Sequence, residues 1–395
     1  MLHQRTITGT DMRDINRSAI LEIIRRESPI SRTTIARRLG VSLPTVMRIV
    51  DELTEEGFVR MHGDTEWSGG RRRSLLEFNA EGHVVMGIDL GGANMFGALA
   101  DLGGNVIDEV EIDRHSAGGE ECLRHLAELI EALLASPKLQ GRQVRGVGVG
   151  VPGITHHREG VVSWAFALNW QDYPLKAKLM ERFHMPITVD NDVNLAALGE
   201  LWFGAGQKAQ NMVFITVAAG IGAGIIIDGA LYRGSHEASG EIGHFVPGRE
   251  FLGQCYAEFG ALESMASGTG ITERARRVLA AQGTAAEGLR VEQVFEAARQ
   301  GQPWAQEIID ETVDYLAIAV ANMSVAFDPE IIVLGGSVTH FADQLIGPML
   351  RRINGAIPTP PPLVVSALGR RAVVMGAITH VLHNTADFYL VRKLS

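Results

Sequence analysis

The stretch ISRTTIARRLGVSLPTVMRIVDELTEEGFV, residues 30–59, decides how the first part of the chain folds. Ser31 can cap one helix, Gly40 supplies the turn that ends it, and Ser42 can cap the next helix. The apolar positions of this next helix recur at i, i+3, i+4 and i+7 and are Val46, Ile49, Val50 and Leu53. Two capped helices separated by a glycine turn predict a helix-turn-helix.

The outer face of the second of these helices carries Thr45 and Arg48, because the apolar stripe turns them away from the core. Helices of this kind meet base edges in the major groove of DNA. An earlier helix over residues 16–27, which Pro29 ends, completes a three-helix unit. We therefore expect Ser42, Thr45 and Arg48 to contact DNA.

Residues 58–61 and 74–78 predict a β-hairpin with its turn over residues 62–70. At the tip or on the rising strand of this hairpin stand Arg71, Arg72 and Arg73. Three adjacent guanidinium groups suit contact with phosphates or with the minor groove. The pattern favours a winged helix-turn-helix, and the alternative is a three-helix interaction module with a solvated arginine run.

Charge is unevenly distributed along the 395 residues. The whole chain has a net charge of −10, but residues 1–80 hold 13 Arg against 11 acidic residues and are net positive at +2. The N-terminal segment is therefore the part suited to a polyanion. The length, with 46% hydrophobic and 21% charged residues, predicts a soluble protein of two or three domains.

No apolar run is long enough to span a membrane, and the first 30 residues carry charges throughout instead of the apolar core of a signal peptide. We therefore expect a cytoplasmic protein. Cys122 and Cys255 are its two cysteines, which excludes a disulfide framework and leaves too few thiolates for a cysteine-built zinc site.

The remainder of the chain places polar residues at strand ends. A strand over residues 84–89 ends at Asp89 before a glycine turn, and in VDNDVNLAALGE, residues 189–200, a strand ends at Asp190, Asn191 and Asp192 where a helix begins. Side chains at strand ends facing a cleft are where α/β proteins place chemistry. The alternative is that Asp190 and Asp192 only cap the helix.

The loop GEIGHFVPGREFLGQCYAEFGALE, residues 240–263, adds a second polar set. Glu241 and His244 are three residues apart and would face the same way on one helical turn, and Glu263 closes the stretch. Carboxylates and imidazoles of this kind hold hydroxyl-rich ligands such as sugars, since each hydroxyl can both donate and accept. The alternative is a polar surface loop.

These motifs, taken in order, resemble those of the ROK family, whose name joins repressors, uncharacterised reading frames and sugar kinases. The motifs are GIDLGGANMFGALADLGG, GVGVGVPGI, VDNDVNLAALGE, ITVAAGIGAGIIIDG, GEIGH and DPEIIVLGGSV, and the winged-helix segment resembles the family's repressor branch, because the kinases lack it. The resemblance implies a two-lobed, actin-like or ribonuclease-H-like sugar-kinase-type α/β body. We expect a winged-helix domain over residues 1–80, lobes over 81–190 and 191–372, and a C-terminal helix over 373–395 that packs back on the first lobe.

The resemblance also assigns a sugar site. It implies that the ligand-binding residues are Gly153, Asn191, Asp192, Glu241, His244 and Glu263. Asp192 matches the kinase base that takes the proton from the attacking hydroxyl. Ala167 stands where the family has a sugar-contacting asparagine, with Asn169 nearby to compensate.

The phosphate-binding turns depart from the kinase pattern. Where family kinases have threonines, this chain has Ala93 and Ala219, and alanine offers no hydroxyl donor to a phosphate oxygen. We therefore expect the turns to be vestigial, with no phosphoryl transfer and Asp192 as an unused base. The residues retained in the turns are Asp89, Gly91, Gly92, Gly220 and Gly222.

The zinc motif departs further. The family resemblance implies zinc held by His244 and three cysteines, but their places are taken by Gln254, Tyr256 and Ala261, and Cys255 lies one residue out of register. A zinc site needs about four ligands. We predict no zinc and no other cofactor, and expect apolar packing to hold the loop through Phe251, Leu252, Tyr256 and Phe259.

Together these patterns predict a DNA-binding regulator of sugar metabolism, acting as a repressor. It would bind a palindromic operator as a homodimer or larger homo-oligomer and sense a sugar through an inactive kinase-like body. Two alternatives stay open: an active ATP-dependent sugar kinase with a fused DNA-binding domain, and a regulator whose body only dimerises. We also expect His156, His157 and His236 to be solvated.

Overall fold

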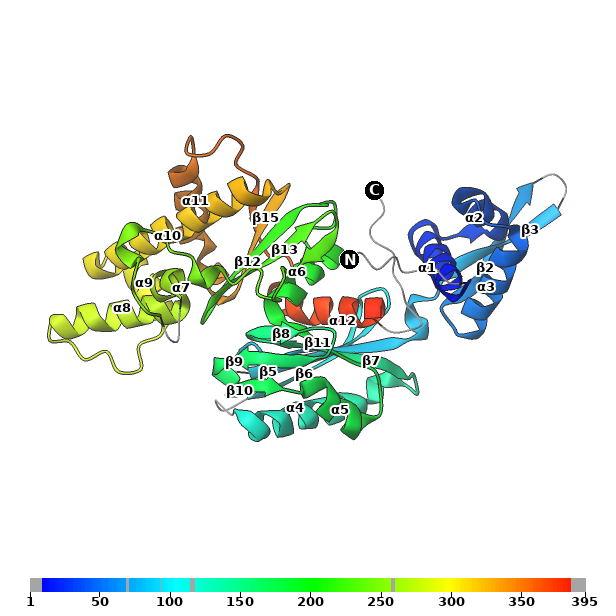
Figure 1. Cartoon of the computed structure of the whole chain (residues 1–395), viewed down its shortest axis with the longest axis horizontal. Coiled ribbons are helices and arrows are strands. Elements are labelled where there is room, and N and C mark those ends of the chain that lie inside the picture. Colours follow the sequence, from blue (N-terminus) through cyan, green and yellow to red (C-terminus); the bar gives the residue numbers. More distant parts are fainter. Residues whose placement is uncertain (1–8, 69–70, 93, 114–117, 257–259, 385–395) are drawn as a thin grey trace, which may run out of the picture.

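The computed structural model describes residues 9–68, 71–92, 94–113, 118–256 and 260–384. It has an N-terminal domain and a two-lobed body (Figure 1). In that view the N-terminal domain (blue) lies at one end of the molecule, and the helices between residues 261 and 353 lie at the other. None of the helices in the described ranges is long and apolar enough to cross a membrane.

The N-terminal domain is a winged helix-turn-helix, as predicted. Its elements are α1 (Gly9–Glu27), β1 (Ile30–Ser31), α2 (Arg32–Leu39), α3 (Leu43–Glu55), β2 (Val59–Ser68) and β3 (Arg71–Phe78), with sheet order β1-β3-β2. The Ser31 and Ser42 hydroxyls cap α2 and α3 by accepting from backbone amides three residues on, and Gly40 takes a left-handed φ of 64°. The predicted stripe Val46, Ile49, Val50 and Leu53 is fully buried.

The wing is longer than predicted. Its strands pair as far as Ser68 and Arg71, so the connection shrinks to residues 69–70, which lie outside the described residues. Arg71, Arg72 and Arg73 therefore begin the rising strand β3 and do not form a loop tip. The side chains of these three arginines also lie outside the described part of the structure.

The two lobes of the body have the same sheet topology. The first sheet has the order β11-β7-β4-β5-β6 and the second β14-β13-β12-β15-β16. In each, the three strands contiguous in sequence pair antiparallel, and two later strands add in parallel beside the first of them. This repeat, which no compositional signal showed, establishes the duplicated α/β body that the resemblance implied.

The first lobe comprises β4 (Val84–Asp89), β5 (Asn94–Asp101), β6 (Val106–Asp113), α4 (Gly119–Leu134), β7 (Val144–Val151), α5 (Leu175–Phe183) and β11 (Ile187–Asn191). A small separate sheet is formed by β8 (Ile154–His156), β9 (Val161–Ala165) and β10 (Trp170–Tyr173). Short 3-10 turns η1 (Ala80–Gly82), η2 (Pro137–Leu139) and η3 (Phe166–Leu168) connect these elements. Helix α6 (Asp192–Phe203) then leads from β11 into the second lobe.

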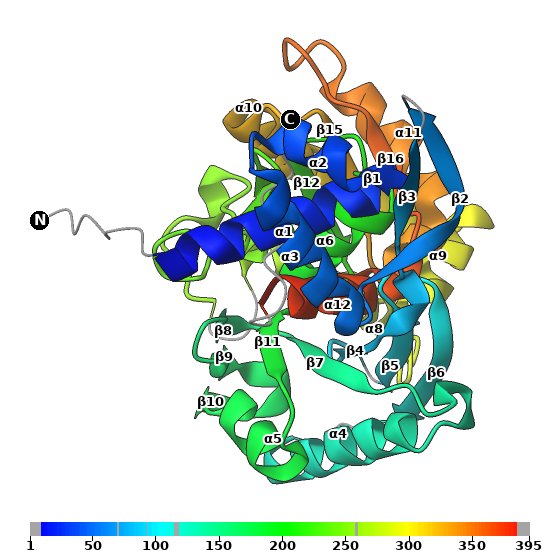
Figure 2. The same cartoon turned by 90° about the vertical axis from the view of Figure 1, so that its right-hand side faces the viewer.

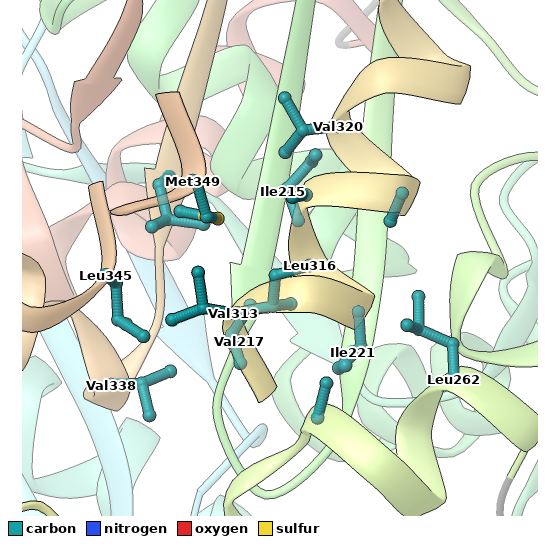
Figure 3. Packing of buried hydrophobic residues seen from close by; sticks show 14 of the residues in the cluster. Ile215, Val217, Ile221, Leu262, Val313, Leu316, Val320, Val338, Leu345 and Met349 are labelled. Atoms are coloured by element: carbon teal, nitrogen blue, oxygen red, sulfur yellow. The ribbon is translucent and has the colours of Figure 1, made fainter. Parts of the chain in front are cut away.

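The second lobe contains β12 (Met212–Val217), β13 (Ile221–Ile227), β14 (Ala230–Tyr232), β15 (Ile331–Gly335) and β16 (Leu363–Val365). Its helices are α7 (Ala261–Ala266), α8 (Gly268–Ala281), α9 (Val291–Arg299), α10 (Pro303–Phe327) and α11 (Ala342–Ile353), with 3-10 turns η4 (Ile242–His244), η5 (Arg249–Phe251), η6 (Ser337–Phe341) and η7 (Gly369–Arg371). Val313, Leu316 and Val320 of α10 pack against sheet residues including Ile215 and Val217 (Figure 3). Burying each such side chain contributes about 1.5–3 kcal/mol.

The last described helix, α12 (Ala372–Asn384), packs against α6 and against β4 and β7 of the first sheet. The approach is close: a Cβ on Gly148 would lie 2.4 Å from the Ala377 carbonyl oxygen, and one on Gly376 would lie 1.6 Å from that of Leu195. Glycine is therefore required at both contacts. The domain boundaries drawn from the sequence stay predictions.

A compact joint fixes the winged helix on the first lobe, and Figure 2 shows this domain in front of α12. Arg145 Nε of β7 donates to His83 Nδ1 at 3.1 Å, so His83 Nε2 carries the proton and donates to the Glu56 carbonyl oxygen at 2.8 Å. Burial, and then the nearby Arg145, lower the pKa of His83. A second contact places the Arg25 guanidinium of α1 5.1 Å from the centroid of the Trp202 ring of α6.

Candidate functional site

The centre of the candidate site is the junction of β11 and α6. Asn191, the last residue of β11, caps α6 by accepting from the Asn194 amide at 2.9 Å, and its Nδ2 donates to the Gly153 carbonyl oxygen at 3.0 Å. The alternative that Asp190 and Asp192 merely cap the helix is therefore wrong. An amide group has two donors and two acceptor lone pairs, so Asn191 retains one of each for a ligand.

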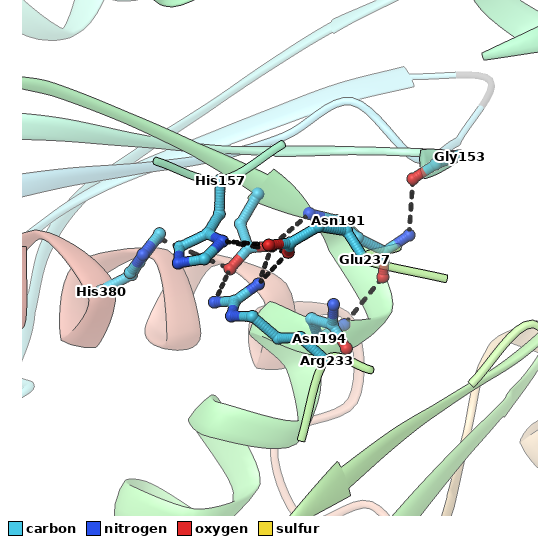
Figure 4. A network of polar contacts seen from close by, with 8 residues as sticks. Gly153, His157, Asn191, Asn194, Arg233, Glu237 and His380 are labelled. Atoms are coloured by element: carbon cyan, nitrogen blue, oxygen red, sulfur yellow. Dashed lines mark hydrogen bonds and ion pairs between the residues drawn. The ribbon is translucent and has the colours of Figure 1, made fainter. Parts of the chain in front are cut away.

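Asp190 precedes Asn191 in the chain, is completely buried, and belongs to a network that joins both lobes. Figure 4 shows Arg233, Glu237, His157 and His380 of this network. The Arg233 guanidinium, which follows β14 of the second lobe, donates to both Asp190 oxygens, at 2.8 and 2.5 Å. Arg233 also pairs with Glu237 at 3.6 Å, and Glu237 bonds His157 Nδ1 at 2.9 Å. Burial alone would raise the pKa of Asp190, but the Arg233 guanidinium, His380 and the Asn191 amide together outweigh burial and lower that pKa.

His380 of α12 completes this network, with Nδ1 3.8 Å from Asp190 Oδ2. Burial, together with the positive Arg233 and nearby His157 and Lys176, lowers the pKa of His380 to about 4, against the attraction of Asp190. The imidazole is therefore neutral near pH 7. The network ties β11, the β14 loop, the β8–β9 turn and α12 together directly behind Asn191.

On the ligand side of the junction, Asp192 and Asp89 are brought together across the first glycine turn. A Cβ on Gly91 would lie 2.4 Å from Asp192 Oδ2 and 3.0 Å from Asp89 Oδ1, so only glycine fits between these carboxyls. Burial raises the pKa of Asp89 to about 6. Burial, followed by repulsion from Asp89 and Glu241, raises the pKa of Asp192 well above its ordinary value.

Glu241 and Glu263 come from the second lobe. Glu241 precedes the 3-10 turn η4, where burial raises its pKa, with His244 opposing and Glu263 adding to the rise. Glu263 lies in the first turn of α7, and its two oxygens accept from the amides of Ile221 at 3.1 Å and Gly260 at 3.4 Å. Burial also raises the pKa of Glu263, although these amides act against it.

Electrostatic repulsion thus connects four carboxyls from both lobes. Asp89 and Glu241 both raise the pKa of Asp192, and Glu263 raises the pKa of Glu241. Because their pKa values are raised, some of these groups can donate as well as accept hydrogen bonds. His244 is exposed at the edge of the set. Such a set suits a neutral polyol, whose hydroxyls need both kinds of partner.

The second glycine turn, around Gly220, packs against Glu263 of this carboxyl set. A Cβ on Gly220 would lie 2.1 Å from Glu263 Oε1, and one on Gly222 would lie 3.0 Å from the Val193 side chain. A side chain at position 220 would therefore displace Glu263, and one at position 222 would press on Val193. Ala219 is exposed and offers no hydroxyl, and Ala93 lies outside the described residues.

The donors of the loop after His244 do not fit the zinc that the family resemblance implies. The Gln254 amide donates to the Glu250 carbonyl oxygen at 2.7 Å, the Tyr256 hydroxyl donates to Gln254 at 3.1 Å, and Ala261 has no donor atom. Within the described ranges, no three His, Cys, Asp or Glu side chains are grouped to hold a metal.

The predicted apolar support of this loop is correct only in part. Phe251 is buried, and its ring packs edge-on against the Tyr315 ring, with 5.8 Å between the ring centroids. The prediction is wrong for Leu252, which is 67% exposed, and Phe259 lies outside the described residues. Tyr256 is half-buried.

The sequence analysis missed the network around Asp190. Arg233, Glu237 and His380 belong to no motif, and His157 was expected to be solvated, which is wrong because it is half-buried against Glu237. Charge alone could have flagged Asp190, since a carboxylate in an apolar strand needs a partner. Its partner, Arg233, is 43 residues further along the chain, directly after β14 of the second sheet.

The candidate DNA-binding surface differs from its prediction in detail. Ser42 and Thr45 bond each other through their hydroxyls at 2.8 Å, and Thr45 is half-buried. Arg48 is exposed and pairs with Glu52 at 2.9 Å. The apolar side chains of Leu43 and Met47, which the sequence analysis did not single out, stand exposed on the same helix.

Comparison with known proteins agrees with this architecture. The ROK family model matches residues 85–384, and a winged helix-turn-helix DNA-binding model matches residues 13–60. A xylose repressor from Caldicellulosiruptor bescii is 31% identical over 96% of this chain and 98% of its own length. A glucokinase from Halalkalibacterium halodurans is 35% identical over 67% of this chain and 83% of its own.

Among solved structures, a ROK family transcriptional regulator, homologous to the E. coli MLC protein, superposes with a TM-score of 0.81 at 25% identity, covering 94% of this chain and 96% of its own. The regulators align with both the winged helix and the body, whereas the glucokinase covers a smaller share of the chain. This chain belongs to the ROK family.

Proposed function

We propose that this protein is a sugar-responsive transcriptional repressor whose kinase-like body binds a sugar without phosphorylating it. One observation carries the proposal: a winged helix with an exposed recognition helix is joined to a body that holds the sugar-facing carboxyls but lacks the phosphate-facing hydroxyls. We further propose that it acts in the cytoplasm as a homodimer on a palindromic operator, since two half-sites suit a two-fold protein.

The sugar would lie between the lobes and contact Asn191, Asp192, Glu241, His244 and Glu263. Gly153 would hold Asn191 in place through its carbonyl oxygen. A ligand that bridges the lobes favours the conformation in which both sides reach it, and it shifts the equilibrium by its differential affinity for the two states. The names of the relatives make xylose and glucose the first sugars to test.

Helix α6 provides the route from sugar to DNA. Its first turn is capped by Asn191 in the site, and near its other end Trp202 lies under Arg25 of the winged helix. Twelve residues of helix span about 18 Å. A movement of the lobes that shifts α6 therefore moves the support of the DNA-binding domain, which couples the two sites.

The experiment that tests this proposal begins with a duplex selected by the full-length protein from a randomised double-stranded DNA library. Its affinity is then measured with and without the sugar that raises the melting temperature most in a sugar panel. We expect the sugar to change DNA affinity at least fivefold in the wild type. Trp202→Ala should keep both binding activities and lose this coupling; a wild type with no coupling contradicts the proposal.

The second candidate is a sugar kinase, which the retained Asp192 and the glucokinase relative favour. Release of ADP from ATP across the same sugar panel separates the two functions. We expect no turnover above background. Turnover that Asp192→Asn abolishes would replace the repressor with a kinase as the primary activity.

We also propose that the protein folds without zinc, because the side chains that replace the cysteines do not fit that metal. Metal analysis of protein purified without chelators should find less than one zinc per ten chains. Stoichiometric zinc that is lost in His244→Ala would show that the loop holds the metal after all.

A further inference from the structure

The first turn and a half of α3 presents an apolar surface to solvent. Leu43 is 39% exposed and Met47 is 47% exposed, although both are large apolar side chains. They stand four residues apart and therefore lie on the same side of the helix, and Pro44, which follows Leu43 in the chain, is also exposed. The buried stripe of Val46, Ile49, Val50 and Leu53 lies on the adjacent flank of the helix, so Leu43 and Met47 extend its apolar surface out of the core and into solvent.

The surroundings of this surface indicate a polyanion as its occupant. Arg48, on the next turn of α3, and Arg37, on α2, are both exposed, and the arginine run of β3 belongs to the same domain. Residues 1–80 are net positive, whereas the rest of the chain is acidic. A surface made only for another apolar protein face would not need this positive surround.

Hydrogen-bonding groups at this end of α3 are largely engaged within the domain. The Ser42 and Thr45 hydroxyls bond each other at 2.8 Å, and Ser42 also accepts from the Thr45 amide at 3.4 Å. Arg48 is held by Glu52, which Arg13 also contacts at 3.1 Å. What this end of the helix offers outward is therefore mainly methyl and methylene surface.

The major groove presents one apolar group to such a surface, the C5 methyl of thymine. We propose that Leu43 and Met47 read thymine methyl groups in the operator, so that part of the sequence specificity is apolar. This inference rests on the proposed function, because it requires α3 to enter the major groove. It adds which chemical feature of the bases is recognised and which side chains recognise it.

The test uses the full-length protein and the duplex selected from the randomised library. In a second set of duplexes, each thymine is replaced in turn by deoxyuridine, which removes the methyl group and leaves every hydrogen-bonding atom unchanged. Burial of one methyl-sized group predicts about fourfold weaker binding at each thymine that is read. Binding is measured at reduced salt so that weakened variants stay measurable.

Met47→Ala should bind the thymine and deoxyuridine duplexes with nearly equal affinity, whereas Met47→Leu, which keeps apolar surface, should retain much of the discrimination. Met61→Ala is the matched control, because Met61 is also 47% exposed in the same domain but lies on the wing strand β2. It should discriminate as the wild type does.

Three results would overturn the inference. The wild type could bind both duplexes alike, or Met47→Ala could keep the wild-type discrimination. Sedimentation could also show that Met47→Ala dissociates a dimer while the discrimination is unchanged, which would assign this surface to self-association. If the library yields no enriched duplex at all, the proposed DNA-binding function fails together with the inference, and that outcome is distinct from the other three.

Discussion

The body has two regions that are built by different means: the sugar end, which is the proposed site around Asp192, Glu241 and Glu263, and the nucleotide end, which is the pair of glycine turns that carry Ala93 and Ala219. At the sugar end, burial raises the pKa values of Asp89, Asp192, Glu241 and Glu263, and repulsion from neighbouring carboxylates adds to the rise for Asp192 and Glu241. At the nucleotide end, glycine turns with an exposed Ala219 remain, and a Cβ on Gly220 would lie 2.1 Å from Glu263 Oε1. At the sugar end, buried carboxyls therefore repel one another, and we expect the hydroxyls of a bound polyol to relieve this repulsion. At the nucleotide end, the glycine turns make packing contacts through uncharged residues.

Under the proposed function, this difference explains how a kinase-like body would bind a sugar without phosphorylating it. Hydroxyl groups satisfy carboxyls of either protonation state, so the sugar end works without a metal or a nucleotide. A triphosphate would add negative charge beside Asp89 and Asp192 and would find no threonine hydroxyls. The predictions that follow perturb first the support of the sugar end, then its carboxyls, and finally the nucleotide end.

The largest effect is expected from Arg233→Ala, which leaves Asp190 buried without its partner. Breaking a buried ion pair on one side costs about 3–5 kcal/mol, so the melting transition of the body should fall by roughly 10 °C. Arg299→Ala is the matched control, since Arg299 pairs with Asp343 on the surface, and it should change stability by less than about 1 kcal/mol. Adding Asp190→Asn should recover part of the loss; equal effects of the two arginines would contradict the buried-pair account.

A pH effect follows from His380. Its folded pKa of about 4 lies below the ordinary value of 6.5, so between these values the unfolded chain binds a proton that the folded chain does not. Stability is therefore lost as the pH falls from 6.5 towards 4, by on the order of 2–3 kcal/mol from this group. Denaturation measured across that range should show His380→Gln gaining stability relative to the wild type as the pH falls, because the opposite effect of the raised pKa of Asp89 is common to both proteins.

The control for this measurement is His156→Gln, because His156 is exposed on β8. It should follow the wild-type pH profile. A His380→Gln variant that gains no stability relative to the wild type as the pH falls would place the responsible group elsewhere in the network.

Asp192→Asn tests the strain at the sugar end. Removing one of several repelling carboxyls should stabilise the unliganded protein by about 1 kcal/mol, while the melting shift produced by the sugar should shrink or vanish. Glu287→Gln is the control, because Glu287 is exposed and does not belong to the proposed sugar site, and it should alter neither quantity. If the Asp192→Asn variant is less stable than the wild type, repulsion at Asp192 does not destabilise the unliganded protein. If the variant also binds sugar normally, Asp192 does not belong to the sugar site.

The sequence predicted local structure well where one residue dictates the backbone. The serine caps, the left-handed Gly40 and the buried stripe of α3 follow from rules that act within a few residues, and all are confirmed. Asp89 and Asp192 meet across Gly91, and Glu241 acts on the pKa of Asp192, but the role of these carboxyls in ligand binding stays a prediction. Only their neighbourhood, and not their pKa values, could be inferred from motifs.

Contacts between distant segments could not be predicted in this way. Arg233 and Asp190 meet because β14 and β11 belong to two sheets that fold towards each other, and no local spacing encodes that approach. The exposed Leu43 and Met47 escaped notice for a related reason. Apolar residues on a helix are expected to face the core, and the stripe of α3 was already complete without them.

The smallest expected effect concerns the nucleotide end. Restoring hydroxyl donors in Ala93→Thr with Ala219→Thr should strengthen binding of a non-hydrolysable ATP analogue by roughly fivefold for each hydrogen bond formed, which is about 1 kcal/mol. The melting shift produced by the sugar should stay unchanged, because Glu263 is held by the amides of Ile221 and Gly260 and not by the side chain at position 219. Analogue affinity by calorimetry and sugar-dependent melting measure the two ends separately. If the double variant alters the sugar response as much as the nucleotide affinity, the two ends are not independent, and the sugar end would then depend on the geometry of the phosphate turns.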